Sequence, residues 1–359
     1  MSQPRATPPA LAAWTALRAS GTPDGALVTL VRADGGASRA LGMHLALARD
    51  GRAFGSVTVG GCADGRALQA AARVIETGTS ERLTLPLSEA DAIALGLGCA
   101  GDVDLLVERV SLGGADPVAA AFDAALDAVT RGARAVLATP LSRGAMGRLL
   151  VHVGGEAAGG TGDPARDAQG LALAGTLLQA GEDTPAIHEV DGASWFLQPL
   201  APARTLLIVG ATEIAAALCA FAPTLGWRTV LLDPRDAVLA EPRFATATER
   251  IASLPAEQVA TRIHGPDAPA VIVVAHDYRV ELPVLRAALA GRSAYVGMLG
   301  SRTRGATMRR MLAEDGLGDA QVQRLRTPIG LAIGARGPAE IAVSIVAEVI
   351  AAWRGAAIA

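Results

Sequence analysis

The first segment with chemical potential is glycine-rich and carries a single cysteine, residues 55–65 (GSVTVGGCADG). Cys62 follows Gly60 and Gly61, and Asp64 comes two residues later. A thiol at such a turn could bind a metal, attack a carbon atom, take part in redox exchange or hold a sulfur-rich ligand, or it could simply be packed. The glycines predict close approach of the backbone to another group, which favours a functional role for Cys62.

The other two cysteines have different surroundings. Cys99 lies in GLGCAG, where a functional role and simple packing both stay open, whereas Cys219 lies in the apolar helical stretch AAALCAFA, which favours packing. There is no CxxC pair, and the histidines form no HxxxH or HExxH cluster. A disulfide framework and a closed zinc site are therefore not expected.

A second candidate site follows an apolar strand in the last third of the chain. Gly210 stands where the strand turns into a helix, Ala215 comes five residues later, and Asp233 follows Gly210 by 23 residues. This spacing indicates a mononucleotide-binding turn with an acidic residue that reaches a ribose hydroxyl. However, Thr212 replaces the glycine that lets the backbone approach a pyrophosphate, and Glu213 adds a charge that would oppose phosphate. A phosphate-bearing ligand and an altered pocket on a retained scaffold both stay open.

Further polar residues come at predicted strand ends and helix starts. His276 follows the strand VIVVA, where it could be a polar clamp, a base or an ordinary strand-end residue. Ser301 and Arg302 lie in a predicted strand-to-helix turn, and Gly334 and Arg336 lie in a loop before a long helix. Backbone N–H groups and arginines in such turns could hold a phosphate, although ordinary helix starts have the same pattern.

The composition limits the classes of protein to consider. The chain has 359 residues, 51% of them hydrophobic, with a formal net charge of -3 and a pI near 6.0. Its basic residues are scattered, which argues against a nucleic-acid partner or a polybasic membrane surface. No stretch reaches the roughly 18 apolar residues that a membrane span requires, and the amino end has no signal-peptide pattern. We expect a cytoplasmic protein whose partners are small molecules or proteins.

Two domains are predicted, residues 1–200 and 201–359. Pro199 and Pro202 interrupt an extended segment just before a new apolar strand. The first domain is predicted to be mixed α/β, with strands at 25–33, 43–51, 101–110, 133–141 and 147–155 and helices at 66–78 and 116–132. Residues 154–165 are interpreted as a mobile surface loop. In the second domain, strands and helices alternate regularly, which predicts a Rossmann-like, doubly wound parallel sheet.

Five segments together resemble the xanthine dehydrogenase accessory protein family (XdhC/CoxI): GSVTVGGCADG, GLGCAGDVDLLVE, LLIVGATEIAAAL, YVGMLGSRTR and TPIGLAIGARGPAEIAVSIVAE. The resemblance implies a chaperone, rather than an enzyme, that binds molybdenum cofactor, protects it and inserts it into a molybdenum hydroxylase such as xanthine dehydrogenase. It further implies a cysteine desulfurase or sulfurase as a partner, which installs the terminal sulfido ligand. We also expect a homodimer.

The cofactor is a pterin dithiolene with a phosphate tail, in a plain or a nucleotide form. Amide-rich loops would hold its phosphate and oxo groups, and the resemblance makes Cys62 and Cys99 the candidates for a thiolate near the metal, with Cys62 the favoured one. The predicted cofactor-binding residues are Gly60, Gly61, Cys62, Asp64, Cys99, Gly210, Asp233, His276, Ser301, Arg302, Gly334 and Arg336.

The sequence departs from the family pattern in several side chains. Val59 and Asp64 stand where serine and glutamate are usual, Thr212 and Glu213 replace glycine and histidine, and Ala332 replaces an aspartate. Two alternatives therefore stay open. One is an NAD(P)-binding oxidoreductase, and the other is a docking scaffold that has lost cofactor binding.

Overall fold

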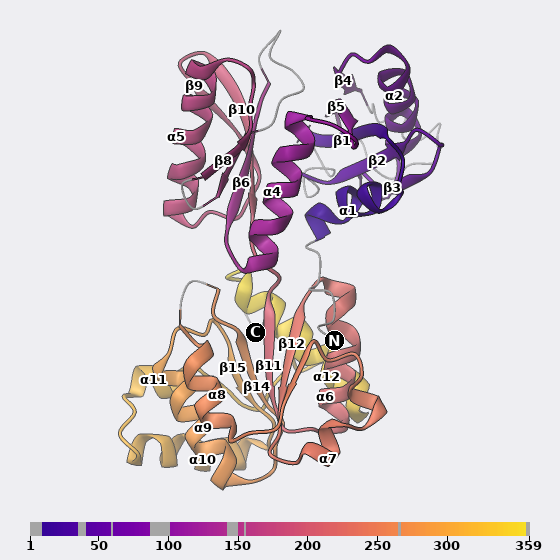
Figure 1. The fold of residues 1–359 in the computed structure, drawn as a ribbon. Coiled ribbons are helices and arrows are strands. Elements are labelled where there is room, and N and C mark those ends of the chain that lie inside the picture. Colours follow the sequence, from indigo (N-terminus) through magenta and orange to yellow (C-terminus); the bar gives the residue numbers. More distant parts are fainter. Residues whose placement is uncertain are drawn as a thin grey trace. The chain divides into compact units, whose positions relative to one another are not determined.

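The computed structural model describes residues 9–34, 41–58, 60–86, 101–141, 150–153, 156–264 and 267–356. Contacts within the chain divide it into two compact units, Thr7–Pro202 and Ala203–Ala359. Figure 1 shows the elements of both units, and each unit is described by itself. In the described residues, no helix is both long and apolar enough to cross a membrane.

The first unit begins with a five-stranded antiparallel sheet in the order β3-β2-β1-β5-β4. The strands of this sheet are β1 (Asp24–Ala33), β2 (His44–Ala48), β3 (Ala53–Gly55), β4 (Glu81–Leu85) and β5 (Val103–Ser111). The helices of this part of the chain are α1 (Ala12–Ala19) and α2 (Asp64–Thr77). The buried face of α2, with Ala67, Ala71 and Val74, shares a core with apolar residues of β1 and β5. Gly78 ends this helix in the left-handed conformation, with φ of 74°, as the sequence predicts.

A second antiparallel sheet of the same unit has the order β8-β7-β6-β10-β9. The strands of this sheet are β6 (Ala135–Pro140), β7 (Leu150–Val153), β8 (Glu156–Gly159), β9 (Ala186–Val190) and β10 (Ala193–Leu200). The helices of this part of the chain are α4 (Pro117–Arg131) and α5 (Pro164–Ala180). The two sheets of this unit are joined where Gln198 Nε2 donates to the carbonyl oxygen of Gly42 at 2.9 Å. Leu106 of β5 and Phe196 of β10 share one small apolar cluster, so the sheets have a common core.

The interpretation of residues 154–165 as a loop is wrong for residues 156–159 and 164–165, whereas residues 160–163 connect two elements as a loop and residues 154–155 lie outside the described residues. Residues Glu156–Gly159 form β8, which pairs antiparallel with β7, and Pro164 begins α5 with Asp163 as its side-chain cap. The small residues of β8 have little strand propensity of their own, so pairing with β7 determines this strand.

The second unit contains a six-stranded parallel sheet in the order β13-β12-β11-β14-β15-β16. The strands are β11 (Thr205–Val209), β12 (Arg228–Leu232), β13 (Glu249–Ile251), β14 (Ala270–Val273), β15 (Val296–Met298) and β16 (Leu325–Arg326). The helices are α6 (Glu213–Phe221), α7 (Asp236–Leu239), α8 (Pro255–Arg262), α9 (Tyr278–Ala290), α10 (Arg302–Glu314), α11 (Asp319–Gln323) and α12 (Gly337–Trp353). The mixed α/β fold with a Rossmann-like second domain is thereby confirmed.

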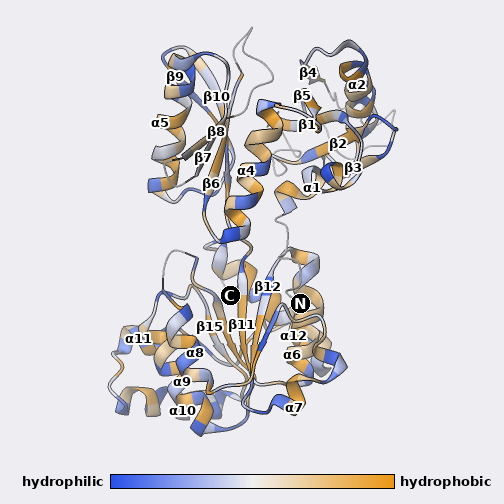
Figure 2. Cartoon of the chain, viewed as in Figure 1, coloured by the Kyte–Doolittle hydropathy of each residue, from blue (hydrophilic) through white to orange (hydrophobic). Residues whose placement is uncertain are grey.

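Burial of both sheet faces explains why these strands read as apolar runs. Leu206 and Ile208 of β11 pack in one core with residues of α6 and α12, whereas Leu207 and Val209 pack in another with residues of α8, α9 and α10. Figure 2 shows the resulting hydrophobic colour along β11. Because the strand order reverses between β11 and β14, a crevice opens at the carboxyl ends of these two strands, where such sheets collect ligands.

Candidate functional site

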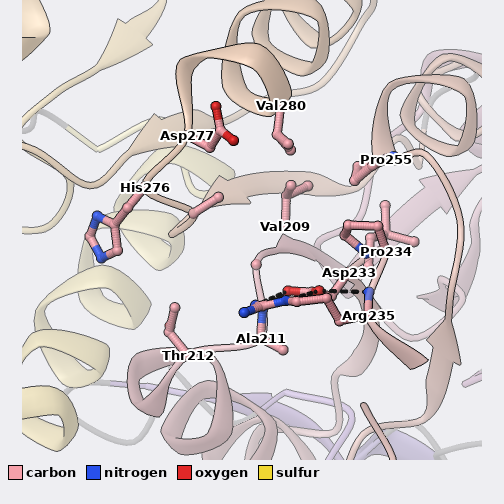
Figure 3. Close-up of a pocket in the computed structure, with 13 residues that line it drawn as sticks. Val209, Ala211, Thr212, Asp233, Pro234, Arg235, Pro255, His276, Asp277 and Val280 are labelled. Atoms are coloured by element: carbon pink, nitrogen blue, oxygen red, sulfur yellow. Dashed lines mark hydrogen bonds and ion pairs between the residues drawn. The ribbon is translucent and has the colours of Figure 1, made fainter. Parts of the chain in front are cut away.

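A cavity of ≈ 480 Å³ lies at the carboxyl ends of β11, β12 and β14 (Figure 3). The residues around it come from the three strand ends and the segments that follow them, together with Pro255 at the start of α8. Its polar lining includes Thr212, Asp233, Arg235, His276 and Asp277, and Gly210 forms part of its wall. The fold thus places this cavity at the position where ligands bind in doubly wound sheets.

The turn after β11 requires glycine at its first position. Gly210 has φ of 105°, and a Cβ atom at this position would lie 2.7 Å from the backbone nitrogen of Ala275. Thr212 follows in an extended conformation and caps α6, because its Oγ1 accepts a hydrogen bond from the N–H of Ala215 at 3.3 Å. Thr212 therefore replaces the second glycine of the nucleotide motif with a helix cap.

Asp233 is buried, and its carboxylate is fully engaged by its neighbours. Oδ2 accepts from the N–H of Ala211 at 2.8 Å and from Nη2 of Arg235 at 2.7 Å. Oδ1 accepts from the N–H of Arg235 at 3.0 Å and from Nε of Arg235 at 2.8 Å. Burial opposes ionisation, but the hydrogen bonds from Arg235 and Ala211 hold the pKa of Asp233 below its usual value.

Glu213 does not oppose a ligand in the way that the sequence suggested. Its exposed carboxylate forms an ion pair with Arg243, which follows it by 30 residues. Glu213 is also absent from the described residues that line the cavity. The negative charge at the start of α6 is therefore compensated outside the cavity.

His276 and Asp277 lie at the end of β14, as predicted, but they differ in their bonding. The Asp277 carboxylate caps α9 by accepting from the N–H of Arg279 at 2.9 Å, and it also pairs with the guanidinium of Arg279. His276 is exposed at the cavity wall. Of these two residues, His276 has the side chain that is available to a ligand.

The two other predicted anion sites lie outside this cavity. Ser301 caps α10 by accepting from the N–H of Arg304 at 3.2 Å, and Arg302 is exposed. Gly334 is exposed with φ of 76°, and the N–H of Arg336 donates to Oε2 of Glu340 at 2.6 Å. The N–H of Arg336 is thus already bonded, and neither pair is among the described residues that line the cavity.

A buried ion pair beside these turns was not foreseen from the sequence. Glu281 in the first turn of α9 has no exposed surface, and its Oε2 accepts from Nη2 of Arg304 at 2.5 Å. Arg304 also donates to the carbonyl oxygen of Leu299 and lies over the ring of Tyr278. Burial raises the pKa of Glu281. The acidic residue five positions after His276 was the available sequence clue.

The cysteine-containing turn belongs to the first unit. Cys62 is half-buried at the edge of the core beneath α2, and its thiol donates to Oγ1 of Thr58 at 3.5 Å. Asp64 accepts from the N–H of Val57 at 3.0 Å, which closes the turn. Gly60 and Gly61 are exposed, and Gly61 has φ of 69°.

The structure therefore brings three of the predicted residues together, namely Gly210, Asp233 and His276, around one cavity. Cys99 lies outside the described residues. Within the described part of the chain, no group of three or more His, Cys, Asp or Glu side chains could hold a metal ion. Any thiolate contact with a metal in the first unit would therefore rely on the metal's other ligands.

Comparison with known proteins relates both units to one family. The profile of the XdhC and CoxI family matches residues 17–86, and the profile of the XdhC Rossmann domain matches residues 206–349. A protein of Bacillus subtilis (strain 168), described as a probable subunit of xanthine dehydrogenase, is 24% identical over 326 residues, which cover 90% of this chain and 92% of that protein.

Two further similarities extend over most of the chain. The molybdenum cofactor insertion chaperone PaoD of Escherichia coli (strain K12) is 27% identical over 323 residues, 90% of this chain and 81% of that protein. A crystal structure of a xanthine dehydrogenase from Bacillus halodurans matches with a TM-score of 0.77 and 25% identity, over 95% of this chain and 94% of that one.

Proposed function

The chain belongs to the XdhC and CoxI family, and from this membership we propose that it binds molybdenum cofactor and inserts it into a molybdenum hydroxylase. The observation that carries the proposal is the similarity to a molybdenum cofactor insertion chaperone, which extends over 90% of the chain. We further propose xanthine dehydrogenase or a related enzyme as the client, a cysteine desulfurase or sulfurase as a second partner, a homodimer as the working form and the cytoplasm as its location.

The cavity of the Rossmann-like unit supports this proposal by its chemistry. The cofactor ends in a phosphate group, and phosphates bind where helix N-termini, backbone N–H groups and arginine side chains converge. The start of α6, His276 and Arg235 provide such an environment at the switch point of the sheet. In this proposal Gly210, Asp233 and His276 surround the phosphate within this cavity.

The turn of the first unit is proposed as a separate binding point for the cofactor, which it would contact through the metal. Cys62 is half-buried and bonded only weakly, through a thiol hydrogen bond of 3.5 Å to Thr58. A soft thiolate suits a molybdenum centre that already carries dithiolene sulfurs. The exposed glycines before it, Gly60 and Gly61, leave the backbone accessible, and Asp64 holds the turn.

The proposal is tested by anaerobic co-elution of the purified chain with molybdenum cofactor, with molybdenum and pterin both quantified. We expect the wild type to retain both, and Cys62→Ala to retain markedly less molybdenum. The matched control is Cys219→Ala, which removes a thiol buried within α6 and should bind like the wild type.

Two outcomes would count against the proposal. A wild type that retains no molybdenum contradicts cofactor binding. If that protein still supports maturation of the client enzyme, the result favours the docking-scaffold alternative. Equal molybdenum retention by the wild type and Cys62→Ala contradicts the role of the thiol alone.

A further inference from the structure

The carboxylate at the end of β12 has no acceptor capacity left for a ligand. A carboxylate offers about four acceptor positions. Asp233 uses them all, because each of its oxygens accepts two hydrogen bonds from Ala211 or Arg235, over distances of 2.7 to 3.0 Å. In Rossmann domains that bind NAD, the acidic residue at this position accepts from the ribose hydroxyls. A ribose diol would have to break bonds that already hold the turn together.

Arg235 replaces Asp233 as the group that faces a ligand here. Its side chain lines the cavity and is 61% exposed. Nε and Nη2 are bonded to Asp233, whereas Nη1 has no hydrogen-bond partner among the described residues. Figure 3 shows Arg235 beside Asp233, with dashed lines for the contacts between the two residues. The bidentate pair fixes the plane of the guanidinium, so its remaining N–H groups are oriented before any ligand arrives.

We propose that this end of the cavity is a phosphate monoester subsite built on Arg235, and that it discriminates against an unphosphorylated ribose diol. In Rossmann domains that bind NADP, an arginine near the end of this strand accommodates the ribose 2′-phosphate. The same chemistry would hold the phosphate tail of molybdenum cofactor. The inference deepens the proposed function. Binding of the cofactor's phosphate tail at this subsite rests on that function.

A repeated motif in the same unit provides a matched control. Asp277 and Arg279 form the same pair two residues apart, with the N–H, Nε and Nη2 of Arg279 all bonded to the Asp277 carboxylate. Arg279 is 90% exposed and is not among the described residues that line the cavity. Removing the guanidinium of Arg279 therefore changes a similar ion pair without touching the proposed subsite.

The test compares two probes that differ by one phosphate, adenosine 2′,5′-bisphosphate and adenosine 5′-monophosphate, by isothermal titration calorimetry. We expect the wild type and Arg279→Gln to bind the bisphosphate about tenfold or more tightly than the monophosphate, as a charge-assisted bidentate contact allows. Arg235→Gln should lose most of that preference. Circular dichroism and thermal unfolding would establish that each variant is folded.

A second arm of the test identifies the source of the phosphate. If purified molybdopterin lowers the apparent affinity for the bisphosphate, the cofactor tail occupies the subsite. If both bind together, the subsite serves a nucleotide. Either result supports the subsite, because both require the preference for the bisphosphate.

The inference is overturned if the wild type binds both probes equally, prefers the monophosphate or binds neither at millimolar concentration. It is also overturned if Arg235→Gln keeps the full preference. Its failure is separable from failure of the proposed function. Molybdenum retention without a bisphosphate preference removes only the subsite, whereas the preference without molybdenum retention leaves the subsite and removes the chaperone.

Discussion

The backbone N–H of Ala211 donates a hydrogen bond of 2.8 Å to Oδ2 of Asp233, which ties the turn after β11 to the end of β12. These two chain segments form adjacent walls of the cavity. The same carboxylate orients Arg235, so one buried aspartate determines both the backbone and the cation on this side of the site.

Replacing Asp233 by asparagine should therefore destabilise the second unit. The loss of charge-assisted hydrogen bonds is expected to cost about 2 kcal/mol at neutral pH. Because the folded pKa lies below the ordinary value, the stabilisation is complete above the unfolded pKa of about 3.9 and is lost as the pH falls through the folded pKa. Urea denaturation of wild type and Asp233→Asn at pH 7 and at pH 3 measures this. The exposed Glu182→Gln is the control, and a difference that does not shrink at low pH would contradict the account.

Replacing Gly210 by alanine should lower the free energy of unfolding more than replacing a glycine that needs only a positive φ. Gly210→Ala adds a Cβ atom 2.7 Å from the nitrogen of Ala275, whereas Gly316, with φ of 94°, has no atom within 4 Å of such a Cβ. Both substitutions should cost about 1 to 2 kcal/mol for positive φ, and Gly210→Ala should cost more because the backbone at Ala275, just after β14, must also shift. Equal losses of unfolding free energy would show that the close approach to Ala275 is unimportant.

His44 in β2 predicts a pH-dependent stability of the first unit. Burial lowers its pKa to about 4, and its Nδ1 lies 3.0 Å from Oγ1 of Thr29. The unfolded chain therefore binds a proton that the folded chain excludes, and the free energy of unfolding should fall by about 1.4 kcal/mol per pH unit below about pH 6.5. Denaturation between pH 6.5 and 5 should show this slope reduced in His44→Asn. The exposed His264→Asn should keep it, and an unchanged slope in His44→Asn would contradict the assignment.

The two described cysteines should react very differently in the folded protein. Burial raises the pKa of Cys219 to about 11, so at pH 8 only about one thiol in a thousand is ionised. Cys62 is half-buried. In a Cys99→Ala background, iodoacetamide should modify Cys62 in the native protein and Cys219 only after unfolding, as measured by peptide mass spectrometry. Labelling of both at similar native rates would contradict the burial of Cys219.

Periodicity and local motifs predicted much of the fold. The apolar runs at 205–210, 228–233 and 270–276 became adjacent parallel strands, and Asp116 caps α4 as its place before Pro117 indicates. The strand β8 was missed because its pairing with β7, rather than its side chains, creates it. Local sequence patterns do not contain such pairing.

The site was predictable in position but not in bonding. Gly210, Asp233 and His276 converge because the carboxyl ends of parallel strands lie on one edge of the sheet. Arg235 and the N–H of Ala211 together saturate the carboxylate of Asp233, which depends on side-chain conformations. Arg243 compensates the charge of Glu213 through a contact between residues 30 positions apart. Neither is encoded in the spacing of the motif.

The central claim, delivery of molybdenum cofactor, is tested most directly by a transfer experiment. The chain, loaded anaerobically, is mixed with a cofactor-free xanthine dehydrogenase while a large excess of a competing apo-protein captures any free cofactor. Molybdenum is then quantified in each protein after separation. We predict that molybdenum leaves the chain and appears in the dehydrogenase together with its activity. Molybdenum found mainly in the competitor, or a chain that never takes up the cofactor, would contradict the account.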